Sequence, residues 1–166
     1  FLLDFLNKKE ADIVFVTDLD ILITNFTKKI EDFVSADGDL FITKDVNGIN
    51  AGSFIIKNTE RGRNLISGIL SHNGKEDNEQ KAMQKHFERE FTILPHPSIN
   101  SYMYECYGGE KWGRHHGNGP KPKHTEGNWQ PGDFLLHLPG LVVERRISIL
   151  QDKMKDVIYE PTEEHA

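Results

Sequence analysis

The chain is poor in cysteine, with Cys106 alone among its 166 residues. A single cysteine excludes an internal disulfide and a cysteine-based zinc site. It says little about the compartment, because secreted proteins can also lack disulfides. Any metal in this protein is therefore expected on oxygen and nitrogen ligands.

Long apolar runs and a basic bias are also missing. No apolar stretch approaches the roughly 20 residues needed to span a membrane, and no basic segment precedes an apolar one at the amino terminus. We therefore expect no membrane segment in this chain, and any anchor outside it. Lysine and arginine total 20 against 26 acidic residues, a formal charge of -6. Nucleic-acid binders typically carry a basic bias, so we expect no nucleic-acid partner.

The composition that is present, 37% hydrophobic and 28% charged, is typical of one globular domain. We expect a single catalytic domain over residues 1–166. The chain opens abruptly at Phe1 in an apolar, helix-like segment. This start indicates a fragment, or an unusually short version of a larger fold, and the domain is expected to be partial.

The stretch from Asp12 to Asn25 contains the clearest chemical signal. The apolar run Ile13 to Val16 predicts a buried strand that ends near Thr17. Asp18 and Asp20 follow it, and in an extended backbone both carboxylates would leave the same face of the sheet. Two like charges beside apolar residues are costly unless a cation, a hydrogen-bond network or a shared proton compensates them. A divalent metal is the simplest compensation.

Two classes of enzyme use a strand that ends in Asp-x-Asp, and ordinary aspartates that cap turns are the alternative to both. In one class the carboxylates hold Mn²⁺ or Mg²⁺, which bridges a substrate diphosphate. In the other, the phosphatases of the haloacid-dehalogenase type, the first Asp attacks phosphorus and the second transfers a proton. That class normally has a glycine after the second Asp, whereas Ile21 stands here. Ile21 at this position therefore counts against a phosphatase.

His137 is a second candidate ligand. It lies in an apolar strand, where a histidine is by default a hydrogen-bonded core residue. Turn-forming residues at 131–133 and 139–140 flank this strand and place His137 near an irregular rim. An imidazole suits Mn²⁺ beside carboxylates, although it would be an unusual ligand for Mg²⁺.

Further segments are candidates for substrate contact or for packing. The small residues from Asn50 to Ser53, expected before a core strand, let a backbone or ligand approach closely. Glu79 and Gln80 open a predicted helix, where they can orient a sugar or simply favour the helix dipole. Residues from about 102 to 132 are expected to form a long loop, either a functional lid or disordered. Its tryptophans, Trp112 and Trp129, either pack onto the core or stack on a sugar ring. A final amphipathic helix is expected at about 143–160.

Five segments occur in an order that resembles one family: Asp18-Leu19-Asp20, Asn50-Ala51-Gly52-Ser53-Phe54, Glu79-Gln80-Lys81-Ala82, Asn100-Ser101-Tyr102, and Pro131 to Gly140. The set resembles the galactosyl/mannosyltransferase family, which includes fungal α-galactosyl- and α-mannosyltransferases and plant xyloglucan xylosyltransferases. The resemblance extends from about Asp12 to Gly140, and it is far more specific than Asp-x-Asp alone.

The resemblance implies an α/β fold of the GT-A type, a Rossmann-like sheet flanked by helices. In that family the nucleotide-base pocket is built largely from the sheet half that precedes Asp-x-Asp, so the fold is expected to lack its N-terminal nucleotide-binding portion. The implied activity is metal-dependent, retaining transfer of a hexose or pentose from a UDP- or GDP-sugar to a glycan acceptor. The implied cofactor is Mn²⁺, with Mg²⁺ possible. A degenerate fold that only binds glycans or a partner is the alternative.

The resemblance also implies roles for individual residues: Asp18, Asp20 and His137 as metal ligands, Asn50, Ala51 and Gly52 at the donor sugar, and Glu79 and Gln80 near the sugar being transferred. Glu79 would be a nucleophile or would stabilise a cation. Plant relatives place a lysine shortly after the His-x-x-Gly motif, whereas Leu141 and Val142 stand here. Phosphate contact would then fall to Arg145, Arg146 or a loop lysine. The implied location is the Golgi lumen for a eukaryotic member, and the cytoplasm for a viral or bacterial one.

Overall fold

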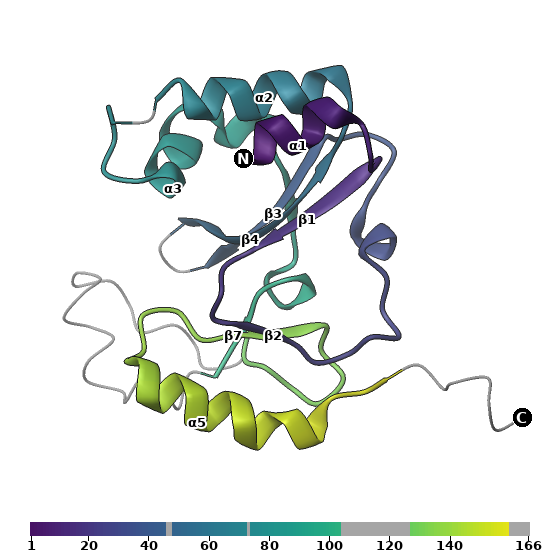
Figure 1. Cartoon of the computed structure of the whole chain (residues 1–166), viewed down its shortest axis with the longest axis vertical. Helices are drawn as coiled ribbons and strands as arrows, with labels where there is room; N and C mark the ends of the chain where they lie inside the picture. Colours follow the sequence, from purple (N-terminus) through teal and green to yellow (C-terminus); the bar gives the residue numbers. More distant parts are fainter. Residues whose placement is uncertain (46–47, 73, 104–126, 160–166) are drawn as a thin grey trace, which may run out of the picture. The chain divides into compact units, whose positions relative to one another are not determined.

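The computed structural model describes residues 1–45, 48–72, 74–103 and 127–159. The chain divides into two compact units, and each is described by itself (Figure 1). The first unit comprises Phe1–Asp18 and Ile30–Pro95, and the second comprises Leu19–Lys29 and His96–Ala166.

The first unit is built on a four-stranded sheet with the strand order β1-β4-β3-β5. The strands are β1 (Ile13–Thr17), β3 (Leu40–Asp45), β4 (Gly48–Lys57) and β5 (Thr92–Leu94). β4 runs antiparallel to both β1 and β3, whereas β3 runs parallel to β5. In the β1–β4 register Thr17 lies opposite Ser53, and the amide of Asp18 donates to the carbonyl of Gly52 at 2.8 Å. The end of β1 is therefore fixed against the small residues of β4.

The small residues of β4 differ from expectation. We expected Asn50 to Ser53 before a strand, but they lie inside β4. The cause is pairing on both sides, because β4 is hydrogen-bonded to β1 and to β3. Neighbouring strands thereby override the weak strand propensity of glycine and asparagine.

Helices cover this sheet in the first unit. They are α1 (Leu2–Lys8), η1 (Ile30–Phe33), α2 (Glu60–Leu70), α3 (Glu79–Ala82), η2 (Met83–Phe87) and η3 (Glu88–Glu90). Thr59 caps α2, and its hydroxyl oxygen accepts from the amide of Gly62 at 2.9 Å. One apolar cluster joins Leu6 of α1 and Ile66 of α2 to Ile56 of β4. Figure 1 shows α1 and α2 side by side over these strands.

The second unit has a three-stranded sheet with the order β2-β7-β6. The strands are β2 (Ile21–Ile23), β6 (Ser101–Tyr102) and β7 (Leu135–His137). β7 lies in the centre, antiparallel to β2 and parallel to β6. The helices of this unit are η4 (His96–Ser98), α5 (Val143–Lys153) and η6 (Met154–Asp156). His137 is therefore the last residue of a central strand.

Trp129 belongs to the core of the second unit. It is 5% exposed and packs in one cluster with Leu136 and Leu138, against which Ile149 and Leu150 of α5 also pack. Its indole N–H donates to the hydroxyl oxygen of Thr24 at 3.2 Å. Of the two alternatives, the packing role is confirmed for Trp129, whereas Trp112 and most of the expected 102–132 loop lie outside the described residues.

Among the residues that the structure describes, no helix is both long and apolar enough to cross a membrane.

Candidate active site

Asp18 and Asp20 do not share a strand face. β1 ends at Thr17, as predicted, but Leu19 and Asp20 form a turn before β2 begins at Ile21. The expectation of two carboxylates on one extended strand is therefore wrong, because the backbone leaves the extended conformation directly after the strand.

Asp20 and His137 lie together in the second unit. Ile21 pairs with His137 in the β2–β7 ladder, and the amide of Leu138 donates to the carbonyl of Asp20 at 3.0 Å. The carboxylate atom Oδ1 of Asp20 lies 3.3 Å from Nε2 of His137, and the two side chains are 12% and 2% exposed. The ladder therefore positions a carboxylate and an imidazole side by side, with both side chains largely buried.

Asn100 decides which nitrogen of His137 carries a proton. The carboxamide oxygen of Asn100, a buried residue, lies 2.7 Å from Nδ1 of His137. A carboxamide oxygen can only accept, so Nδ1 of the imidazole must donate. In a neutral ring this leaves the lone pair on Nε2, the nitrogen beside Asp20, where it is available to a metal.

Arg146 of α5 also reaches Asp20. Its Nη2 lies 3.1 Å from Oδ2 of Asp20, and the same nitrogen donates to the carbonyl of Leu141 at 3.0 Å. Burial acts to raise the pKa of Asp20, but contact with His137 and the positive charge of Arg146 outweigh it, so this pKa lies below its ordinary value. Asp20 is therefore a carboxylate at neutral pH.

Three buried polar atoms at this site lack a hydrogen-bond partner among the described residues: Oδ1 of Asp20, Nε2 of His137 and Nε of Arg146. Unpaired buried polar atoms are expensive and call for an explanation. The two acceptors, the oxygen and the lone-pair nitrogen, are of the kind that a cation would satisfy.

One group of acidic and histidine side chains in the described part of the chain can hold a metal ion. It consists of Asp18, Asp20 and His137, and one ligand atom of each lies within 4.8 Å of the others. Asp18 is the last residue of the first unit and is joined to Asp20 through Leu19 alone. Two carboxylates and an imidazole form a donor set that suits Mn²⁺ and similar divalent ions. The residues present therefore fit a divalent metal.

The residues expected at the donor sugar meet in the first unit. The amide of Ala51 donates to Oε1 of Gln80 at 3.0 Å, and the amide of Gly52 donates to Oδ1 of Asn50 at 2.9 Å. Gln80 thereby ties α3 to β4. Glu79, its neighbour, is exposed in the first turn of α3.

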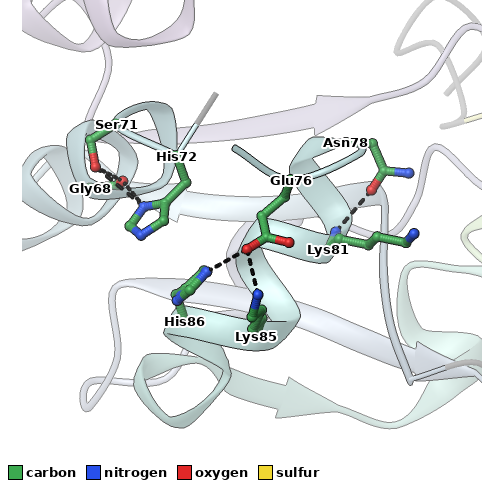
Figure 2. A network of polar contacts seen from close by, with 8 residues as sticks. All are labelled: Gly68, Ser71, His72, Glu76, Asn78, Lys81, Lys85 and His86. Carbon is green, nitrogen blue, oxygen red and sulfur yellow. Dashed lines mark hydrogen bonds and ion pairs between the residues drawn. The ribbon is translucent and has the colours of Figure 1, made fainter. Parts of the chain in front are cut away.

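A polar network holds the segment that leads into α3 (Figure 2). Glu76 accepts from Nζ of Lys85 at 2.8 Å and faces Nε2 of His86 at 2.9 Å. These two contacts lower the pKa of Glu76 to about 2, and the contact with Lys85 has the larger effect. The ring of His86 stacks on that of His72, with the centroids 4.1 Å apart. The network therefore fixes the start of the helix from which Gln80 reaches Ala51.

Two neighbours of the candidate ligands were not predicted in these roles. Asn100 belongs to a family motif that does not indicate this contact, and it lies 37 positions before His137. Arg146 is a candidate for phosphate contact in the sequence, whereas in the structure it is paired with Asp20. No local pattern reveals either contact, because both depend on how β6, β7 and α5 pack.

Comparison with solved structures shows the fold. A glycosyltransferase involved in the glycosylation of the major capsid of PBCV-1 superposes with a TM-score of 0.63 at 13% identity, over 91% of this chain and 72% of that one. The galactosyltransferase LgtC, solved with donor and acceptor sugar analogs, gives a TM-score of 0.56 at 13% identity, over 98% of this chain and 69% of that one. At such identities the likeness shows the fold alone, and it confirms the expected α/β fold of the GT-A type.

Comparison of sequences shows the family. A probable alpha-1,2-galactosyltransferase, gmh1 of Schizosaccharomyces pombe, is 31% identical over 129 residues, which cover 70% of this chain and 33% of that protein. The chain thus spans about a third of the length of this relative. The family model of the galactosyl transferase GMA12/MNN10 family matches residues 4–148. The chain therefore belongs to the galactosyl transferase GMA12/MNN10 family, as its motifs predicted.

Proposed function

We propose that this chain is part of a metal-dependent glycosyltransferase that moves a hexose or pentose from a UDP- or GDP-sugar to a glycan acceptor with retention of configuration. Membership of the family supports sugar transfer. The observation that supports the metal is the pair of unsatisfied atoms, Oδ1 of Asp20 and Nε2 of His137, which lie 3.3 Å apart in a buried setting.

In this proposal Asp18, Asp20 and His137 hold Mn²⁺, with Mg²⁺ as the second choice. The bound ion would supply a Lewis acid that stabilises the leaving nucleoside diphosphate. The protein contributes orientation, because Asn100 keeps the proton on Nδ1 of His137 and so leaves Nε2 for the ion. Burial of the pair also strengthens electrostatic interactions there, because little water screens them.

The donor sugar is proposed to lie against Asn50, Ala51 and Gly52. Gly52 has no side chain to keep a sugar away from the backbone of β4. Gln80 bonds to the amide of Ala51, so its position relative to this backbone is set. Glu79, the exposed carboxylate beside it, is proposed to act as a nucleophile or to stabilise positive charge on the sugar.

The test is hydrolysis of a panel of UDP- and GDP-sugars by the wild type and by Asp20→Ala, each with and without Mn²⁺. We expect hydrolysis that requires Mn²⁺ and that is lost in the variant. Asp37→Ala is the matched control, since it removes an exposed carboxylate in a bend of the first unit. Turnover without metal, or full activity of Asp20→Ala, would contradict the proposal.

A further inference from the structure

Arg146 places a positive charge on the carboxylate that the proposed metal would use. Its Nη2 is 3.1 Å from Oδ2 of Asp20, and the two side chains are 25% and 12% exposed. The same nitrogen donates to the carbonyl of Leu141, which anchors the guanidinium at the start of α5. Asp20 therefore already has a cation as its partner.

The pairing of Arg146 with Asp20 is incomplete. Arginine can meet a carboxylate through two parallel hydrogen bonds. Here Oδ1 of Asp20 and Nε of Arg146 are both buried without a hydrogen-bond partner among the described residues. A single contact is thus made where two are available, and the remaining donor and acceptor stay free for other groups.

A charge count shows what the entry of a divalent ion would do. Among the described residues of this site, the charged side chains of Asp18, Asp20 and Arg146 sum to one net negative charge. A divalent cation alone would turn this into one net positive charge and would face the guanidinium at short range, which is unfavourable in a buried setting. A diphosphate that enters with the cation reverses the sign again.

We propose that Arg146 is an internal counter-ion that holds Asp20 while no divalent cation is bound, yields Asp20 to the cation, and then pairs with the phosphate groups that accompany it. The inference rests on the proposed metal-dependent function. A guanidinium suits both partners, because its planar set of donors matches carboxylate and phosphate alike. Metal and diphosphate would consequently bind together more tightly than either binds alone.

The test compares Arg146→Gln with Arg89→Gln, which removes the same charge from an exposed arginine in η3 of the first unit. Mn²⁺ retained by the protein is measured by equilibrium dialysis at matched free Mn²⁺, with and without inorganic pyrophosphate. For the wild type and Arg89→Gln we expect pyrophosphate to increase Mn²⁺ affinity. For Arg146→Gln we expect Mn²⁺ alone to bind about tenfold more tightly, and the effect of pyrophosphate to be lost. Arg146→Lys, which restores the charge, should return affinity toward the wild type.

Other outcomes would overturn the inference. If Arg146 has a purely structural role, Arg146→Gln should bind Mn²⁺ more weakly than the wild type. If Arg146 has no role at the site, the two should bind Mn²⁺ equally. If no variant binds Mn²⁺, the inference has no basis. The inference is also contradicted if pyrophosphate increases the Mn²⁺ affinity of Arg146→Gln as much as that of the wild type. The assay involves no sugar transfer, so a failure of the proposed function would appear separately, in the hydrolysis experiment. Thermal unfolding of each variant confirms that it is folded.

Discussion

Nδ1 of His137 lies 2.7 Å from the carboxamide oxygen of Asn100, so a residue that precedes β6 sets the proton position of an imidazole in β7. The nitrogen that this contact leaves with a lone pair is the one beside Asp20. In the proposed metal site, a buried amide would thus prepare a nitrogen ligand before any ion arrives.

Asn100→Leu should weaken metal binding although it removes no ligand. Leucine has a similar volume but cannot accept the hydrogen bond from Nδ1, so the orientation of His137 and the position of its proton are no longer fixed. We expect the affinity for Mn²⁺, measured by equilibrium dialysis, to fall about 10- to 100-fold. Asn100→Asp keeps an acceptor oxygen and should retain most of the affinity; equal losses in the two variants would refute this role.

Mn²⁺ should raise the stability of the folded chain. A ligand that binds only the native state, supplied at about 100 times its Kd, adds about 2.7 kcal/mol to the free energy of unfolding. The melting temperature should therefore increase with Mn²⁺ and return to its original value with excess EDTA. His137→Gln should abolish the increase. An increase of the same size in that variant would show that the ion binds elsewhere.

Gln80→Leu should destabilise the contact between α3 and β4. The amide of Ala51 would lose its acceptor, which costs about 1–3 kcal/mol for a buried donor and less for a partly buried one. Urea unfolding measures this loss. Gln80→Glu keeps an acceptor oxygen and should stay closer to the wild type. If both variants match the wild type, the hydrogen bond contributes nothing to stability.

Glu76 should give the protein an acid-sensitive contribution to stability. Its pKa of about 2 is below the reference value of 4.5, chiefly because of its contacts with Lys85 and then His86. A lowered pKa in the folded state means that the contribution is complete above about pH 4.5 and is lost as the pH falls toward 2. The difference in melting temperature between wild type and Glu76→Gln should therefore be largest above pH 4.5 and shrink toward pH 2.

Asp77→Asn is the matched control for Glu76→Gln. Asp77, in the bend before α3, pairs with Lys81, and the two side chains are 76% and 57% exposed. Pairs of this kind contribute little to stability. A pH-dependent difference of the same size in Asp77→Asn would show that general charge, rather than the Glu76 network, is responsible.

Local patterns were enough to predict several elements. The apolar run before Asp18 predicted β1 with its end at Thr17, and the amphipathic pattern predicted α5, which begins at Val143 but ends at Lys153. Both depend on neighbours in sequence, namely a short β-branched run and apolar residues at helical spacing. The expected helix after Glu79 is only partly regular, because four α-helical residues pass into the wider turns of η2.

Contacts between distant segments could not be predicted in this way. The motifs indicated Asp20 and His137 as ligands, and the structure places them together, but the assignment of a metal to them stays a prediction. The partner Asn100 precedes β6 and the partner Arg146 lies in α5, both far in sequence from Asp20 or His137, so no spacing reveals them. The turn at Leu19 and Asp20 was also not predicted, because both carboxylates were expected in extended backbone after the strand.

The hydrogen bond from the amide of Leu138 to the carbonyl of Asp20 has a consequence for how this site can fail. His137 pairs with Ile21 in the β2–β7 ladder and Asp20 directly precedes Ile21, so the separation of these two candidate ligands follows from the alignment of two short strands. A slip of that alignment by one residue would turn the side chains of a strand to the opposite face. A substitution in β2 or β7 that contacts neither Asp20 nor His137 should therefore abolish the proposed metal affinity by misaligning the strands.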